Sequence, residues 1–388
     1  MHWVFGSLAL LASWLEGLLR PVLGSVLPHD LFVFIYSSSR SLYLAALGAA
    51  RFEPVNAAHH ETEALGLKFR NDLGNAAGLD KDGSLLEFNY RVGAGYAVVG
   101  TVLDRPHTGT LFHMLGLFRL TAWTPLPHSG AALNSLGLPS KGVDAAVANI
   151  RIFRERHGIA VGDRQAAFPI GVSVMGHPAT ADVDKKLQGV LDCVRKSIPV
   201  ADFIEINESC PNVSHGTSTA DLERRLRAVI AVRDDMASAR KCGRRVPILV
   251  KMGDLHNAAE TVRFMAKLGV DGVVALNTQK DYASFDSALP PADKALLATY
   301  TTKFGGGLSG PPILARSVEQ ARAAATAAAE LENEFTVIHV GGIQTADDVK
   351  KSRNTGAQLR QWYTGLMHNV ATKAPADVYG VTAHYHKH

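Results

Sequence analysis

The chain has 388 residues, of which 47% are hydrophobic and 20% are charged, and its formal net charge is +4. These proportions exclude intrinsic disorder, collagen and coiled coil, and the small positive charge is not the concentrated basic surface of a nucleic-acid-binding protein. The length suits two or three domains of roughly 150 residues, or one large α/β barrel with an extension. Three cysteines are too few for a disulfide framework or a cysteine-rich zinc site, so we expect most of the chain to be reduced and intracellular.

Residues 1–50 are poor in charge and rich in apolar side chains. The stretch 2–19 reaches the short edge of transmembrane length, but Glu16 and the lack of Lys or Arg before Arg20 argue against a signal or transit peptide. A second apolar block follows. We therefore expect two or three short helices, which lie on a bilayer surface, ahead of a catalytic domain at 51–388. The alternative is that these helices simply pack on the rest of the protein.

Beyond Pro54 the sequence alternates between short aliphatic and β-branched runs and helical stretches bounded by Gly, Pro and Asp. Most of these runs are continuously hydrophobic, as expected for strands buried on both faces of a parallel sheet. Eight such units favour a (β/α)8 barrel over an open doubly wound sheet. The predicted strands are Leu73–Leu79, Gly95–Thr101, Phe168–Met175, Ala201–Asn207, Val246–Lys251, Val270–Asn277, Phe335–Gly342 and Gln358–Thr364.

Two gaps between the predicted strands, Val102–Ala167 and Thr278–Glu334, are too long for simple connections. We expect them to carry loops over the mouth of the active site. The helices predicted between strands include Asp221–Arg240, Asn257–Leu268, and two helices that Ser317 and Thr345 open with capping-box spacing.

In a (β/α)8 barrel the chemistry lies at the carboxyl ends of the strands, and polar or glycine residues occur there in nearly every predicted strand. Gly341 and Gly342 end the seventh strand, and Thr364 and Gly365 end the eighth. Small residues ahead of helix starts offer backbone N–H groups and a positive helix end to a phosphate. We therefore expect a phosphate-bearing ligand. Histidines and cysteines do not occur at metal-ligand spacing, so we expect no metal site.

Taken in order, these motifs resemble those of the dihydroorotate dehydrogenases, and specifically the membrane-bound class that uses a quinone. The resemblance extends from about Leu18 to Val370. It implies an FMN at the top of the barrel, a dihydroorotate pocket against one face of the flavin, and a quinone tunnel under the N-terminal helices. The motifs that carry it are Phe69–Gly83, Asn134–Leu138, Asn207–Asn212, Gly306–Pro312, Gly341–Ile343 and Gln361–Gly365.

The resemblance also implies roles for individual residues. Cys210 is the base that removes a proton from carbon 5 of dihydroorotate while hydride leaves carbon 6 for the flavin. The residues implied to contact the substrate are Lys81, Asn134, Asn207, Asn212, Asn277 and Thr278. The residues implied to hold FMN are Ala77, Gly78, Lys81, Thr101, Asn134, Ser173, Asn207, Lys251, Ser309, Gly310, Gly341, Gly342, Tyr363 and Thr364.

Three positions depart from the family pattern. Cys210 stands where the quinone-using class usually has serine and the soluble class has cysteine, so the class markers conflict. A thiol, with an unperturbed pKa of about 8.5, is nevertheless a better base at neutral pH than a hydroxyl group. Ser173 stands where asparagine is general, which puts one ligand contact in doubt, and Arg360 is unexpected inside the eighth strand.

Two other functions stay open. Another FMN barrel with an Asn-x-x-Cys-Pro motif, such as a tRNA dihydrouridine synthase, would need a nucleic-acid surface, and the apolar N-terminus, Lys81 and Asn277 argue against it. A non-catalytic flavin-binding relative would account for Ser173 and Cys210. We expect a monomer that binds dihydroorotate or orotate, a ubiquinone-type quinone and a membrane surface, but no nucleic acid. The membrane would be the mitochondrial inner membrane in a eukaryote and the cytoplasmic membrane otherwise.

Overall fold

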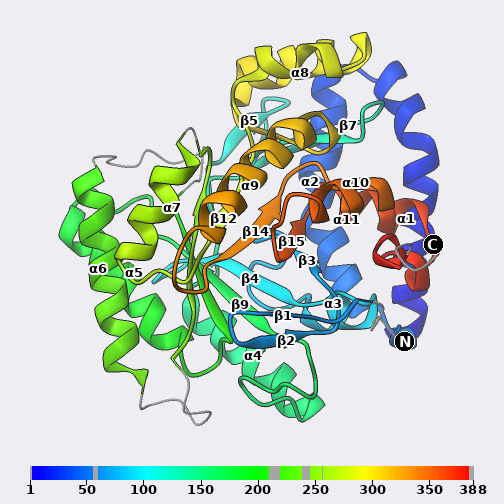
Figure 1. Cartoon of the computed structure of the whole chain (residues 1–388). Helices are drawn as coiled ribbons and strands as arrows, with labels where there is room; N and C mark the ends of the chain where they lie inside the picture. The colour runs from blue at the N-terminus through cyan, green and yellow to red at the C-terminus, as the bar shows by residue number, and fades with distance from the viewer. Residues whose placement is uncertain (1, 56–59, 209–218, 238–244, 256, 384–388) are drawn as a thin grey trace.

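A computed structural model describes residues 2–55, 60–208, 219–237, 245–255 and 257–383. Its centre is a barrel of eight parallel strands surrounded by helices (Figure 1). The predicted (β/α)8 fold is confirmed, and the open doubly wound sheet is excluded. Around the barrel the strands follow the order β3 (Leu73–Asn75), β4 (Ala97–Val102), β9 (Ile170–Val174), β10 (Phe203–Asn207), β11 (Ile248–Met252), β12 (Gly272–Ala275), β14 (Thr336–Val340) and β15 (Leu359–Trp362).

Every barrel strand overlaps its predicted range, and β4 and β11 each run one residue beyond it. The seam between β3 and β4 is closed differently from the other seven joints. A single parallel bridge joins Asp80 to Val99. The Asn75 side chain supplies hydrogen bonds that a regular β-ladder would otherwise provide. Its Nδ2 donates to the Val98 carbonyl at 2.9 Å, and its Oδ1 accepts from the Val98 N–H at 3.1 Å.

In the described part of the chain, eight helices each follow a barrel strand and cover the outside of the barrel. Thr345 caps its helix in a capping box with Asp348, as predicted. The prediction for Ser317 was wrong, because the helix begins at Leu314 and the Ser317 hydroxyl donates to carbonyl groups instead of capping free N–H groups. The helices are α3 (Leu86–Arg91), α4 (Val143–His157), α5 (Val183–Ser197), α6 (Thr219–Asp235), α7 (Ala258–Lys267), α9 (Leu314–Ala329), α10 (Ala346–Arg353) and α11 (Thr364–Thr372).

The amino end of the barrel is filled by side chains. Phe69, Tyr96 and Phe203 pack edge to face there, with ring centroids 5.3 Å and 6.0 Å apart. The hairpin of β1 (Thr62–Ala64) and β2 (Leu67–Phe69) belongs to the same apolar cluster. The barrel interior is therefore a packed core at this end, and space for a ligand is left at the carboxyl end.

The two long gaps form a structured cover over the barrel mouth, where the sequence predicted loops. Three antiparallel strands make this cover, and they place Asn134 opposite Gly307. The strands are β7 (Ala122–Leu126), β8 (Ala131–Ser135) and β13 (Gly307–Ser309). The gaps also contain a hairpin of β5 (Phe112–Met114) and β6 (Phe118–Leu120) and helix α8 (Pro291–Phe304). Short 3-10 helices lie at Tyr282–Ala288, Pro311–Ile313, Pro375–Asp377 and Gly380–Thr382.

The N-terminal segment forms two long helices, α1 (His2–Val26) and α2 (His29–Ala49), where the sequence suggested two or three short ones. They stand beside the barrel (Figure 1), with α1 packed on α2 and α11, and α2 packed on β7, α3 and α8. By length and composition α2 is the described helix that could cross a bilayer, although a third of its apolar window is buried in the fold. From residue 10 onward, the large apolar side chains that α1 leaves exposed are those of Leu11, Trp14, Leu15, Leu18, Leu19, Val22 and Val26.

Candidate active site

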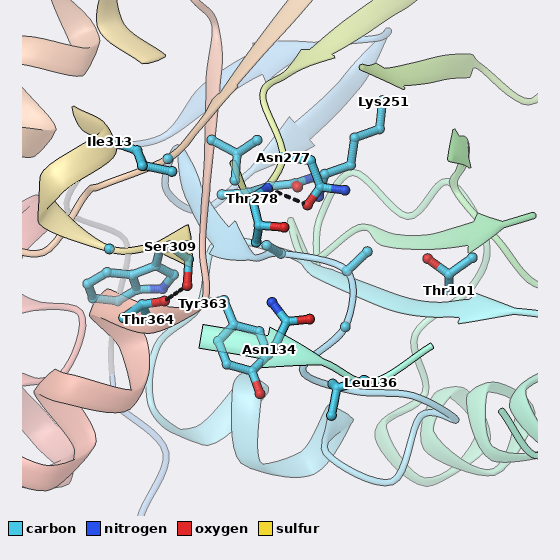
Figure 2. Close-up of a pocket in the computed structure, with 18 of the residues that line it drawn as sticks. Thr101, Asn134, Leu136, Lys251, Asn277, Thr278, Ser309, Ile313, Tyr363 and Thr364 are labelled. Carbon is cyan, nitrogen blue, oxygen red and sulfur yellow. Dashed lines mark hydrogen bonds between the residues drawn. The ribbon is translucent and has the colours of Figure 1, made fainter. Parts of the chain in front are cut away.

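A cavity lies at the carboxyl ends of the barrel strands (Figure 2). It contains every described residue that the sequence predicted for the site except Ser173. Cys210 and Asn212 lie outside the described residues. The predicted residues that line the cavity are Ala77, Gly78, Lys81, Thr101, Asn134, Asn207, Lys251, Asn277, Thr278, Ser309, Gly310, Gly341, Gly342, Tyr363 and Thr364.

The cavity has two distinct ends. Figure 2 shows Ser309 and Thr364 at one end and Thr101 at the other, with Asn134 and Asn277 between them. The arrangement suits an elongated ligand whose middle is read by amide side chains, each of which offers both a donor and an acceptor.

The apolar part of the lining was not predicted from the sequence. Trp123, Leu136, Leu138 and Ile313 contribute to the walls. Their chemistry gave no signal, because apolar residues in connecting segments are equally consistent with packing against the core. Such walls are typical of pockets that hold planar organic ligands.

Thr101 joins two strands at the cavity floor. Asn207 Nδ2 donates to Thr101 Oγ1 at 2.8 Å, and the same oxygen lies 3.1 Å from Ser173 Oγ. Ser173 is buried behind Thr101 and reaches the cavity only through it. The short serine side chain at this position therefore orients Thr101 and Asn207 instead of projecting among the lining residues.

Lys251 is the last residue but one of β11, has its side chain in the cavity wall, as predicted, and is 3% exposed. Its Nζ lies 3.9 Å from Oε1 of the buried Glu205. Glu205 Oε2 accepts a hydrogen bond of 3.0 Å from Nε2 of Gln361, which also lines the cavity. A positive charge thus faces the cavity with a carboxylate behind it.

The end near Thr364 is shaped as a cradle for a small anionic group. Ser309 Oγ and Thr364 Oγ1 lie 2.9 Å apart, and Thr364 begins α11, whose N–H groups point toward the same end. Gly342 has a φ of +77°, and a Cβ there would lie 2.5 Å from the Leu314 Cα. Glycine is therefore needed for the close packing of this loop against α9.

A buried chain of polar side chains anchors the Gly341 loop from outside the barrel. Ser317 Oγ donates to the Gly341 carbonyl at 2.8 Å and lies 2.9 Å from His339 Nε2. Because the hydroxyl proton is used, we assign the ring proton to Nε2, which donates to Ser317. His339 Nδ1 then accepts from Ser352 Oγ at 2.6 Å, and Ser352 accepts from Arg360 Nε at 3.1 Å.

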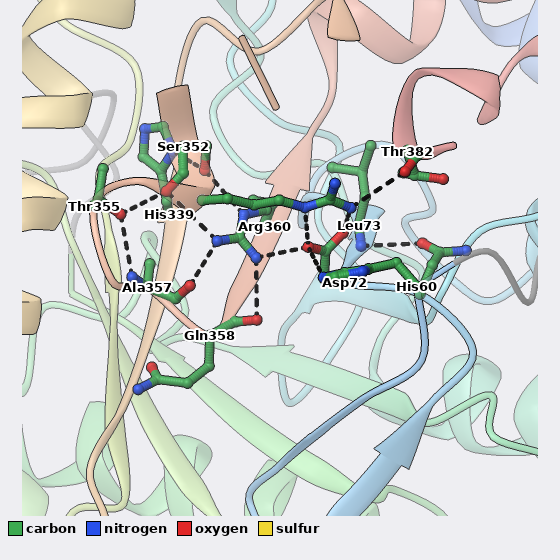
Figure 3. A network of polar contacts seen from close by, with 12 residues as sticks. His60, Asp72, Leu73, His339, Ser352, Thr355, Ala357, Gln358, Arg360 and Thr382 are labelled. Carbon is green, nitrogen blue, oxygen red and sulfur yellow. Dashed lines mark hydrogen bonds and ion pairs between the residues drawn. The ribbon is translucent and has the colours of Figure 1, made fainter. Parts of the chain in front are cut away.

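Arg360, the unexpected arginine of the eighth strand, does not line the cavity and lies instead in a network of polar contacts around Asp72 (Figure 3). Its Nη1 donates to Asp72 at 2.8 Å, and its Nη2 donates to the Ala357 carbonyl at 2.6 Å. Asp72 also accepts two hydrogen bonds from Arg353. Arg360 is therefore a structural residue that ties β15 to β3 and α10.

The His339 ring makes folding sensitive to acid. Burial, with a further contribution from the Arg360 charge, lowers the pKa of His339 to about 3. The unfolded chain has a histidine pKa of about 6.5, so below that pH it binds a proton that the folded state rejects, and folded stability falls as the pH falls. We expect this group alone to cost about 2 kcal/mol of unfolding free energy at pH 5 relative to pH 8.

Urea titrations of the parent and of His339→Gln at pH 5 and pH 8 measure this cost. The variant should lose less stability on acidification than the parent. The difference between the two proteins removes the contribution of Asp80, whose pKa burial raises to about 7 and which acts in the opposite direction. The same pH dependence in both proteins would exclude His339 as the source.

A second, largely apolar cavity lies between the N-terminal helices and the barrel. Trp123, Tyr363 and Thr364 line both cavities and form a shared wall. Arg40 of α2 reaches this wall and donates to the Tyr363 hydroxyl at 2.9 Å. Further residues of the second cavity are Ala12, Ser13, Glu16, Arg20, Tyr36, Ser39, Tyr43, Leu44, Pro125, Gly130, Ala131, Ala132, Met367 and His368.

Three polar side chains of the second cavity, those of Glu16, Arg20 and Tyr36, are paired with one another. Glu16 accepts two hydrogen bonds from Arg20 of the same helix and one from the Tyr36 hydroxyl. Burial and the negative charge of Glu16 raise the pKa of Tyr36 well above its usual value. The phenol therefore stays protonated, and the cluster bears no net charge next to an apolar space.

A model of the family described as Dihydroorotate dehydrogenase matches residues 59–375. The chain belongs to the dihydroorotate dehydrogenase family. A relative from Flavobacterium lutescens, named dihydroorotate dehydrogenase (quinone), is 34% identical over 312 residues that cover 79% of each chain. One of the same name from Acidovorax sp. (strain JS42) is 35% identical over 315 residues, which cover 79% of this chain and 81% of the relative.

Two crystal structures of a dihydroorotate dehydrogenase from Eimeria tenella share the fold. The ligand-free one has a TM-score of 0.69 and covers 89% of this chain and 92% of its own. The complex with ferulenol has a TM-score of 0.65 and covers 91% of this chain and 93% of its own. Both are 21% identical to this chain, so this likeness concerns the fold alone.

Dihydroorotate dehydrogenases hold a flavin, and the first cavity fits one. Its apolar walls suit the flat ring system, Lys251 offers a charge beside it, and the glycine-lined end beside Thr364 suits the anionic tail. Membership of the dihydroorotate dehydrogenase family also leaves the tRNA dihydrouridine synthase alternative without support.

Proposed function

We propose that the chain oxidises (S)-dihydroorotate to orotate in de novo pyrimidine synthesis, with FMN in the first cavity and a membrane quinone as electron acceptor. The observation that carries this proposal is the wall of Trp123, Tyr363 and Thr364 shared by the two cavities. Electrons leaving a ligand in the first cavity would need to cross only these side chains to reach the second. The relatives named as quinone enzymes support the choice of acceptor.

The FMN phosphate would lie at the cradle. Ser309 and Thr364 supply hydroxyl groups there, Gly341 and Gly342 line this end and allow their loop to pack against α9, and the start of α11 adds a positive helix end. Bound FMN supplies the acceptor for the hydride from carbon 6 of the substrate. Lys251, held in the wall, would stabilise the charge that the ring gains.

Dihydroorotate would be oriented by amide and hydroxyl groups. Asn134, Asn277 and Thr278 lie between the two ends of the cavity, Asn207 lies beside Thr101, and Lys81 offers a cation for the substrate carboxylate. Asn212 and Cys210 complete the set as sequence-based predictions, with Cys210 taking the proton from carbon 5. Holding the base and the flavin on opposite sides of the ring would give both bonds the geometry they need to break.

The quinone would enter the second cavity from the bilayer. The space is largely apolar, as a hydrophobic quinone requires, and it lies under the helices that expose apolar side chains. The β5–β6 hairpin adds Leu115, Leu117 and Phe118 to the exposed apolar surface, and the Phe118 ring packs at a tilt against Phe34 of α2 with centroids 4.8 Å apart. We propose a monomer on the cytoplasmic membrane, or on the mitochondrial inner membrane in a eukaryote.

The exposed face of α1 provides a direct test of membrane attachment. Leu18→Glu with Val22→Glu places two charges on that face without touching the lining of either cavity. We expect at least about tenfold weaker binding to lipid vesicles in sedimentation assays, because each leucine-sized side chain buried in a membrane contributes roughly 1.5–3 kcal/mol. Reduction of a water-soluble quinone should stay at the parental rate.

The matched control is Ile152→Glu with Val183→Glu, which changes two equally exposed apolar residues on the barrel helices. This control should bind vesicles as the parent does. Equal loss in both double variants would mean that general surface charge, and not α1, determines attachment.

The activity itself is tested with the purified full-length protein. We expect one FMN per chain and dihydroorotate-dependent reduction of a short-chain quinone. A flavin that dihydroorotate does not reduce would favour the non-catalytic alternative. Preference for fumarate or a nicotinamide cofactor as oxidant would contradict the proposed acceptor and agree with the soluble-class cysteine at position 210.

A further inference from the structure

Glu205 is a buried acid in the barrel interior that the proposed mechanism does not use. It lies on β10, two residues before Asn207 and therefore on the same side of the strand. Its side chain is 0% exposed and does not line the first cavity. Lys251 and Gln361, which do line the cavity, separate it from any ligand there.

The surroundings of Glu205 leave its charge incompletely satisfied. Oε2 accepts from Gln361 Nε2 at 3.0 Å, but Oε1 has no hydrogen-bond partner among the described residues. The charged group nearest to that oxygen in the described structure is the Lys251 ammonium, at 3.9 Å. The other titratable neighbour, Tyr96, uses its hydroxyl to donate to the Arg360 carbonyl.

A buried carboxylate without full hydrogen bonding is costly unless an opposite charge offsets it. Lys251 supplies that opposite charge. Because the Lys251 ammonium is also buried, it in turn needs the Glu205 carboxylate to offset its own burial. The pairing also changes the electrostatic potential in the cavity, because the Glu205 carboxylate reduces the positive potential that Lys251 produces there. In a low-dielectric interior such effects are felt over several ångströms.

We propose that Glu205 lowers the reduction potential of the bound flavin by offsetting the charge of Lys251. This inference rests on the proposed function, which places a flavin against Lys251. A flavin that takes up hydride, that is two electrons and one proton, gains one negative charge. Lys251 stabilises that charge and Glu205 opposes it, so Glu205 favours the passage of electrons onward to the acceptor. Glu205 contacts neither substrate nor cofactor. It acts on the flavin only through the charge of Lys251 and is therefore a positioning residue.

The test is the midpoint potential of the holoenzyme with Glu205→Gln. Glutamine keeps the size of the side chain and a partner for Gln361 but removes the charge. We expect the potential to rise by about 30 mV or more, which is the equivalent of a tenfold change in equilibrium constant for a two-electron couple. Sulfite, which adds to the flavin ring and leaves a negative charge on it, should bind at least about tenfold more tightly to the variant.

Glu208→Gln is the matched control. It removes a carboxylate three residues further along the same segment, where Glu208 pairs with Arg225 at 2.8 Å instead of with Lys251. Its potential should equal that of the parent. Glu205→Met supplies a second neutral variant that needs no hydrogen-bond partner, and Glu205→Asp should keep the parental potential because it keeps the charge.

A parental potential and parental sulfite affinity in either neutral variant would overturn the proposal. Weaker flavin binding at an unchanged potential would identify Glu205 as a packing residue and would overturn it as well. Failure of the proposed function looks different, since the parent itself would then contain no flavin that dihydroorotate reduces.

Discussion

Cys210→Ala is expected to reduce its flavin with dihydroorotate roughly a hundredfold or more slowly than the parent, while orotate binding changes little. The reason is that removal of a general base costs about 10² or more in rate, whereas alanine leaves the asparagine contacts to the pyrimidine ring in place. Stopped-flow absorbance of the flavin under anaerobic conditions measures the rate, and orotate titration of the flavin spectrum measures binding.

Cys210→Ser is the informative companion variant. A hydroxyl group is a weaker base near neutrality than a thiol, so measurable activity should remain but should require higher pH. An alanine variant that reduces its flavin at the parental rate would exclude Cys210 as the base. Another group would then have to remove the proton from carbon 5 of dihydroorotate.

The second large effect is expected at the second cavity. Ala12 of α1 lines this cavity and does not line the first. Ala12→Trp would fill part of the space, and we expect quinone reduction to fall by about tenfold or more, in line with the loss of at least 1.4 kcal/mol of quinone binding. Single-turnover reduction of the flavin by dihydroorotate should be unchanged, because that step uses only the first cavity.

Leu11→Trp is the control for this experiment. Leu11 precedes Ala12 in the same helix but is exposed and lines neither cavity. It should reduce quinone at the parental rate. If Ala12→Trp also behaved as the parent does, the quinone would have to reach the flavin by another route.

The barrel was predictable because its strands are buried on both faces and appear as continuous apolar runs. Helix starts were less certain. Thr345 and Ser317 both have capping-box spacing, yet only Thr345 caps a helix, because Ser317 is used inside α9 to hold the Gly341 loop. The choice depends on a partner 24 residues away, which local spacing does not reveal.

The site was predictable where polar residues end strands, and not where its walls are apolar. The orientation of Arg360 could have been predicted from strand alternation. Gln361 faces the cavity, so the side chain of the adjacent Arg360 must point to the other side of the strand. The same alternation places Glu205 on the side of β10 that Asn207 occupies, but it does not reveal which residue pairs with this acid. Its pairing with Lys251 appears only when β10 and β11 lie side by side.

Helix α11 has nine residues and serves three neighbours at once. Thr364 at its start lies in the cradle, Met367 and His368 one turn later line the second cavity, and its outer side packs on α1. With nine residues, α11 is a rod only about 13 Å long. The helix that begins at the proposed phosphate site is therefore also the helix on which the proposed membrane anchor packs.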